Sequence, residues 1–241
     1  REDPRAASVV WEELQLLPRP ALRSRLRALG APPAEGEGLA PGELVDTVLL
    51  WNALTRLRCG CGGAGGAPAG PSDAFARAEA VDVLRQRGPG LSRRVLEGAL
   101  ASFAVPSHEA QSRGWKRERI AEALLLWQLI RVARSANSTP EQREAALETL
   151  DLVASAPPRL EALQWALEVA GVDDEERSEL RRGEAMGLLR GRVAELALAA
   201  GGAEVRQEFL EWLSVDATEG AAPRSQHSPV GHRALHVLQA P

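Results

Sequence analysis

The chain has 241 residues, of which 44% are hydrophobic, and carries a formal net charge of −4. This length and apolar content suffice for a full hydrophobic core, which excludes a chain that is disordered throughout. The negative balance gives no overall attraction to a nucleic acid, because such binding depends on neutralising phosphates. No run reaches the roughly 20 apolar residues of a membrane span, so we expect at most a peripheral contact with a membrane complex.

The cysteine content bears on the compartment. The two cysteines, Cys59 and Cys61, are one residue apart, so they cannot form the disulfide framework of small secreted domains. We therefore expect an intracellular protein. A chain that begins at Arg1 without an initiator methionine is compatible with a plastid or mitochondrial protein that has lost a targeting peptide.

The first 58 residues are expected to form a small module of three helices. Apolar residues recur there with helical spacing, and strand alternation is nearly absent, which predicts an all-α fold. Asp3 and Pro4 are typical of a helix start. The second helix is expected to stop at Gly30, and the third is expected to start at Gly42.

A glycine-rich segment over residues 59–71 breaks this pattern, since Gly and Pro favour a flexible linker. Residues 72–215 are then expected to form a larger helical domain, either a multi-helix bundle or stacked helical hairpins. Ser72 is expected to cap its first helix. Residues 216–241 are expected to form an extended C-terminal tail.

Three local patterns organise the larger domain. The segment from Trp115 to Arg134 is apolar nearly all round, which predicts a central helix buried on most sides. Thr139 opens a Thr-Pro-Glu-Gln sequence that predicts a capping box, with a helix reaching Ala154. The following helix is expected to stop at Gly171.

The helical pattern places Gly183, Gly187 and Gly191 on one face, and each glycine costs about 1 kcal/mol relative to alanine in a helix. We interpret this face as a close helix-helix crossing or as a surface on which a protein partner lies flat. An equal alternative is two short helices broken near Gly183. Trp212, on a last helix expected from Ala203, is first a core residue and second a candidate for partner contact.

A helical hairpin is predicted over residues 20–54: a basic helix with spaced leucines, a glycine turn, a proline-containing link and a second helix beginning Glu-Leu-Val. The positions that carry the pattern are Leu22, Leu26, Leu29, Gly30, Glu43, Leu44, Val45 and Val48. The stretch resembles the SAP helix-extension-helix motif. The resemblance implies DNA or RNA binding, although related hairpins serve only in protein contacts. The link from Gly30 to Gly42 is longer than in that family, and Thr47 stands where the family tends to have arginine.

A nucleic-acid site on this hairpin would depend on its arginines, and the alternative is that they form a solvated face. The candidates for phosphate contact are Arg23, Arg25, Arg27, Arg56 and Arg58. Four acidic residues of the same hairpin nearly cancel this charge: Glu35, Glu37, Glu43 and Asp46.

The sequence contains no recognisable catalytic or cofactor-binding motif. There is no nucleophile elbow, no His-Glu-x-x-His zinc motif and no phosphate-binding P-loop. Cys59 and Cys61 are more than 160 residues from His227, His232 and His236, and this spacing matches no zinc module. We therefore expect no enzyme activity, no cofactor and no metal site.

These patterns together predict a non-enzymatic helical scaffold or accessory subunit that makes protein-protein contacts within a larger, organellar multi-subunit complex. The alternative is a nucleic-acid-binding protein that uses the SAP-like hairpin.

Overall fold

The computed structural model describes residues 11–59, 71–106 and 114–219, with backbone alone at residues 59, 71, 72 and 202–219. Every regular element in these ranges is a helix and none is a strand, which confirms the all-α prediction. A helical stretch at residues 11–15 comes first. The elements that follow are α2 (Arg19–Ala28), the 3-10 turn η1 (Pro33–Gly36), α3 (Pro41–Cys59), α4 (Pro71–Gln86), the 3-10 turn η2 (Gly88–Gly90), α5 (Arg93–Ser102), α7 (Arg117–Arg134), α8 (Pro140–Ala154), α9 (Leu160–Val169), α10 (Asp174–Ser178) and α11 (Arg182–Glu219).

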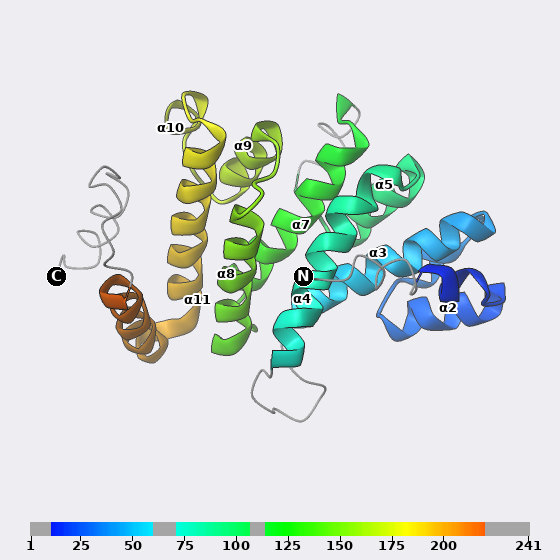
Figure 1. Cartoon of the computed structure of the whole chain (residues 1–241), viewed down its shortest axis with the longest axis horizontal. Coiled ribbons are helices and arrows are strands. Elements are labelled where there is room, and N and C mark those ends of the chain that lie inside the picture. Colours follow the sequence, from blue (N-terminus) through cyan, green and yellow to red (C-terminus); the bar gives the residue numbers. More distant parts are fainter. Residues whose placement is uncertain (1–10, 60–70, 107–113, 220–241) are drawn as a thin grey trace.

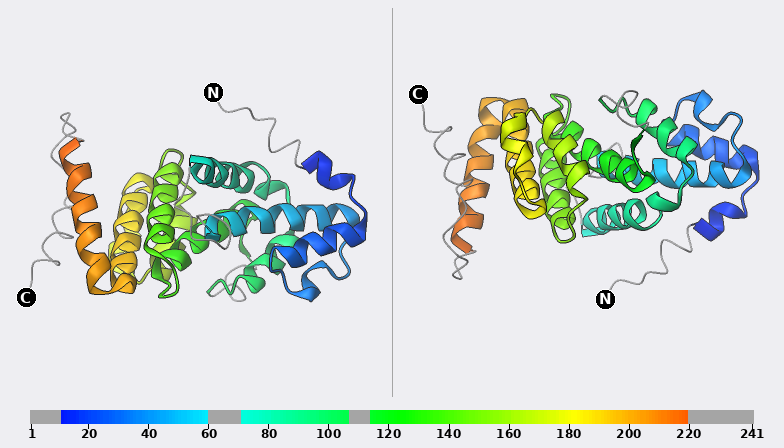
Figure 2. Two further views of the ribbon diagram at one scale, coloured as in Figure 1. Left: turned by 90° about the horizontal axis from the view of Figure 1, so that it is seen from below. Right: turned by 90° about the horizontal axis from the view of Figure 1, so that it is seen from above.

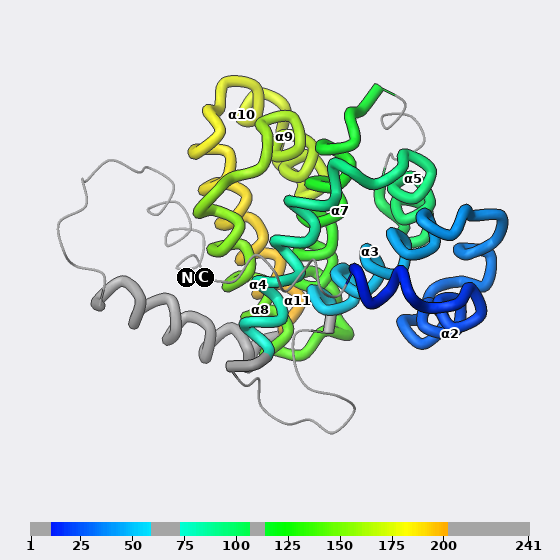
Figure 3. Tube along the Cα trace, turned by 45° about the vertical axis from the view of Figure 1, so that its right-hand side comes forward, coloured from blue at the N-terminus to red at the C-terminus, as the bar shows by residue number. Residues whose placement is uncertain are grey.

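The helices lie in an elongated arrangement with α2 at one end and α11 at the other (Figure 1). In the turned view of Figure 3, α2 again lies at the right-hand side, and α9 and α10 lie at the upper left. Helix α7 lies in the middle and packs against α3, α4, α5, α8, α9 and α11. Every residue from Ala123 to Ile130 is buried. The predicted central helix is therefore confirmed, because two consecutive turns that are buried on all sides require neighbours all round.

One hydrophobic core includes residues on both sides of the glycine-rich segment, from Leu14 to Ala197. Helix α3 packs against α4 and α7, and the rings of Trp51 and Phe103 lie with centroids 4.5 Å apart. The division into separate domains at 59–71 stays a prediction. Helix α3 reaches Cys59 and α4 begins at Pro71, and residues 60–70 between them lie outside the described residues.

Two predicted helix stops and one predicted helix start are confirmed. Gly30 has φ +82° and Gly171 has φ +83°, the left-handed conformation that ends a helix and that glycine adopts without steric cost. At the start of α8, the Thr139 side chain accepts from the backbone N–H of Gln142, and the Gln142 side chain accepts from that of Thr139. The prediction for Ser72 is wrong, because α4 already begins at Pro71.

The segment that carries the three glycines is helical from Arg182 onward, after a break that follows the end of α10 at Ser178. The alternative of two short helices is thus correct about a break near Gly183, but it is wrong about the second helix, because α11 has 38 residues and runs unbroken through all three glycines. Helix α11 then continues to Glu219, so the helix expected from Ala203 is not a separate element.

Candidate interaction surface

The glycine face of α11, formed by Gly183, Gly187 and Gly191, points away from the core. Gly183 and Gly187 are exposed and Gly191 is half-buried, whereas Leu189 and Val193 on the other side of the helix are fully buried. A Cβ atom added at any of the three glycines would meet no atom of a neighbouring element within 4 Å. A close helix-helix crossing at this face is therefore excluded for the described residues, and the face is open.

Polar contacts on both flanks fix α11 to the helices beside it. On one flank, Arg190 Nη2 donates to Asp151 Oδ2 of α8 at 3.0 Å. On the other, Arg192 Nε donates to the carbonyl oxygen of Ala170, just after α9, at 3.0 Å. These partly exposed contacts add to the core packing of Leu189 and Val193, which fixes α11 against its neighbours.

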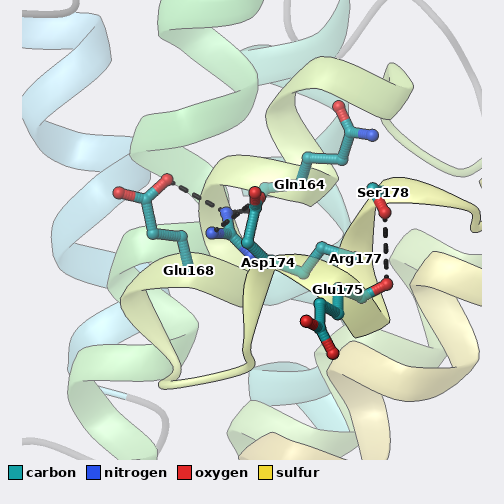
Figure 4. A network of polar contacts seen from close by, with 6 residues as sticks. All are labelled: Gln164, Glu168, Asp174, Glu175, Arg177 and Ser178. Atoms are coloured by element: carbon teal, nitrogen blue, oxygen red, sulfur yellow. Dashed lines mark hydrogen bonds and ion pairs between the residues drawn. The ribbon is translucent and has the colours of Figure 1, made fainter.

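The network in Figure 4 holds the short helix α10 against α9, immediately before α11 begins. Arg177 Nη1 donates to Glu168 Oε2 at 3.1 Å and to the carbonyl oxygen of Gln164 at 3.3 Å. Its Nη2 lies 3.3 Å from Asp174 Oδ1. The Arg177 side chain is 15% exposed, but its partners Glu168 and Asp174 are 46% and 91% exposed, so water weakens these ion pairs. The contacts link α10 to α9 just before the chain leads to Gly183.

The second candidate surface is the exposed part of α2. Arg23, Arg25 and Arg27 are all exposed there, while Leu22 and Leu26 are buried. The three guanidinium groups are therefore accessible to an anion. Because residues two apart do not face the same way on a helix, Arg25 points away from Arg23 and Arg27, and the three do not form one face.

The two remaining candidate arginines do not lie beside those of α2. Arg56 Nη1 lies 2.5 Å from Glu79 Oε2 of α4, so its charge is compensated. Arg58 is exposed at the far end of α3, which extends beyond α2 towards the middle of the molecule (Figure 2). Burial lowers the pKa of Arg131, and the positive charges of Arg58 and Arg134 lower it further. The five candidate arginines therefore do not form one basic surface.

Two acidic residues of the hairpin, Glu35 and Glu43, have a role that sequence reasoning missed: they attach the hairpin to α5. Glu35 accepts hydrogen bonds from Ser102 Oγ at 2.5 Å and from Trp51 Nε1 at 3.4 Å. The Glu43 carboxylate accepts from the backbone N–H of Ala40 and from Ser92 Oγ, each at 3.0 Å, and these bonds lower its pKa. The spacing of three residues back to Ala40 is the sequence signal that could have identified Glu43 as a helix-start residue.

Other candidates from the sequence fall outside what the structure describes. These are the Trp212 side chain, Cys61, His227, His232 and His236, together with Asp3 and Pro4 at the expected helix start. Among the described residues, no group of three or more His, Cys, Asp or Glu side chains is placed to hold a metal ion. No helix in the described ranges is long and apolar enough to cross a membrane.

Comparisons with protein-family models, with curated proteins and with solved structures gave no match for this chain. No relative therefore assigns a role to either surface, and the SAP resemblance stays a prediction.

Proposed function

We propose that this protein is a non-enzymatic helical scaffold or accessory subunit that mediates protein-protein contacts within a larger multi-subunit complex. The observation that carries the proposal is the open glycine face of α11. Glycine inside a helix costs about 1 kcal/mol relative to alanine, and no neighbouring atom of the described chain uses the space left at Gly187 or Gly191. The described part of the chain therefore supplies no contact that offsets this cost, and we assign that contact to another molecule.

The chemistry of the face suits a helix or another flat protein surface. Small residues let two backbones approach closely and gain van der Waals contact along a shared line. The hydrogen bonds of Arg190 and Arg192 hold α11 in place before a partner arrives, which reduces the entropy lost on binding.

A bulky substitution on this face tests the proposal. We expect Gly187→Leu/Gly191→Leu to remove the subunits that co-purify in fixed ratio with the tagged wild-type protein from its native cells. Leucine is a good helix former and both positions have space, so the variant should unfold at a temperature no lower than that of the wild type. Quantitative mass spectrometry measures the first outcome and circular dichroism the second.

Ala199→Leu is the matched control, because Ala199 is exposed on the same helix but on a different face. It should retain the same subunits as the wild type. The proposal fails if both leucine variants retain those subunits equally, or if the wild-type protein purifies as a monomer.

A second candidate function, nucleic-acid binding, is favoured by the three exposed arginines of α2. If it holds, the full chain binds RNA or DNA, and Arg23→Gln/Arg25→Gln/Arg27→Gln weakens that binding by at least about tenfold because phosphate contacts are lost. The loss of these contacts also reduces the salt dependence of the affinity. Fluorescence anisotropy over a series of salt concentrations measures both quantities. Binding that is absent, or insensitive to salt, excludes this function.

A further inference from the structure

Three arginines gather where α3 and α7 end, and none of them is paired with a carboxylate in the part of the chain that the structure describes. Arg58 lies in the last turn of α3, and Arg131 and Arg134 lie in the last turn of α7. The two helices pack against each other. The positive charges of Arg58 and Arg134 both act on Arg131, so the three guanidinium groups are neighbours. We call these three residues the arginine cluster.

Contacts within the chain position two of the three side chains. Arg131 Nη1 donates to the carbonyl oxygen of Phe103 at 3.4 Å, and Trp127 Nε1 donates to the same oxygen at 2.9 Å. The guanidinium carbon of Arg134 lies 5.0 Å from the centroid of the Trp127 ring, in a cation–π contact. Trp127 is only 4% exposed, so the core fixes its ring, while Arg134 is exposed. These contacts form before any ligand binds, which reduces the entropy lost on binding.

The positive charge of the arginine cluster has no acidic counterpart among the described residues. Burial lowers the pKa of Arg131, and the two neighbouring arginines lower it further, with no described acidic residue acting in the opposite direction. Burial also lowers the pKa values of Arg85 and Arg119, but at both of these sites an acidic neighbour opposes the shift. The arginine cluster is therefore held together against its own repulsion.

The helix ends beside the arginine cluster do not balance its charge. The Phe103 carbonyl that accepts from Arg131 lies at the end of α5, so three helices end here. A helix C-terminus carries a partial charge of about −0.5, so α3, α5 and α7 together supply about −1.5 against three full positive charges. A ligand with several negative charges is therefore attracted to this place.

We propose that the arginine cluster binds an acidic peptide segment of a partner protein. Guanidinium groups bind carboxylates through paired N–H···O hydrogen bonds, and a peptide with several carboxylates can reach cations that lie at separate points. The inference rests on the proposed function in one respect, because the acidic segment belongs to another protein of the complex.

The surroundings of the arginine cluster favour a peptide over a nucleic acid. Arg56, also in the last turn of α3, is paired with Glu79, and Glu141 lies in the first turn of α8, which follows α7 along the chain. The phosphates of a nucleic acid continue past any local group of cations, so they would meet these carboxylates. The acidic run of a peptide can end at the cluster.

Binding of a fluorescent polyglutamate peptide to the full chain tests the proposal. We expect saturable binding that weakens as salt is added, although the chain itself has a net charge of −4. Arg58→Gln/Arg134→Gln should weaken the binding by at least about tenfold, since two of the three cations are lost. Both side chains are exposed, so the variant should unfold at a temperature close to that of the wild type. Fluorescence anisotropy measures the affinity and circular dichroism the unfolding.

Arg23→Gln/Arg27→Gln on α2 is the matched control, because it removes the same charge from two exposed positions at one end of the molecule. It should leave the affinity for the peptide unchanged. The measurement uses this chain alone, so it can fail while other subunits still co-purify with the wild-type protein. Failure of this inference and failure of the proposed function are therefore distinguishable.

Four results would overturn the proposal: no saturable binding, equal weakening by the two double variants, tighter binding of a single-stranded oligonucleotide than of polyglutamate, or peptide binding that Glu109→Gln strengthens by about tenfold or more. The third result would assign the arginine cluster to nucleic-acid binding. The fourth would show that a carboxylate of this chain, outside the described residues, already occupies the cluster.

Discussion

Gly88→Ala is expected to lower the free energy of unfolding by about 3 kcal/mol, the upper part of the range for overpacking a core. Gly88 is buried in η2, and a Cβ atom at this position would lie only 2.6 Å from the Cβ of Ala121. Ala121 belongs to the central helix α7 and is 2% exposed, so neither methyl group has room to move. The close approach of η2 to α7 requires glycine. Urea denaturation followed by circular dichroism measures the change.

The double variant Gly88→Ala/Ala121→Gly provides the control. It moves the methyl group from α7 to η2, so it should be more stable than the sum of the two single effects predicts, by at least about 1 kcal/mol. Ala121→Gly alone is expected to destabilise by about 1 kcal/mol or more through helix propensity and lost burial. Strict additivity, or a Gly88→Ala variant as stable as the wild type, would contradict the packing described for η2.

Gln128→Leu is expected to raise the free energy of unfolding by about 1–2 kcal/mol, because a buried polar group without a partner costs about that much. Gln128 is fully buried in α7, and neither its Oε1 nor its Nε2 has a hydrogen-bond partner among the residues that the structure describes. Leucine has a similar volume and no polar atoms, so it removes this cost while it preserves packing. Thermal and urea unfolding of the full chain measure the gain.

Gln128→Glu tests the same site in the opposite direction. A carboxylate at this position would be buried without a partner, so the variant should be less stable than the wild type, and the loss should grow as the pH rises and the group ionises. A Gln128→Leu variant that is less stable than the wild type by more than 1 kcal/mol would show that the amide forms hydrogen bonds in solution.

The helix ends show how much of the fold follows from local sequence. Gly30, Gly171 and the Thr139 capping box were predicted correctly, because a left-handed C-terminal residue and a capping side chain act on the backbone next to them. The central helix was also predictable, since an apolar surface on all sides of α7 has to be covered.

The candidate surfaces could not be predicted from the sequence, because they depend on contacts between residues far apart in the chain. The sequence placed three glycines on one helix face, but it did not reveal whether that face packs against a neighbour or lies open. Sequence reasoning also grouped Arg56 with the basic residues of the hairpin, whereas in the structure Arg56 pairs with Glu79 of α4.

The sequence by itself therefore determined the all-α class, several helix boundaries and the identity of the central helix, because these depend on interactions within a few residues or on the total apolar surface of one helix. Only the tertiary structure decided which charges are paired and which glycines have space around them. Those properties depend on the distance between side chains of different helices, and that distance is set by the packing of the whole core.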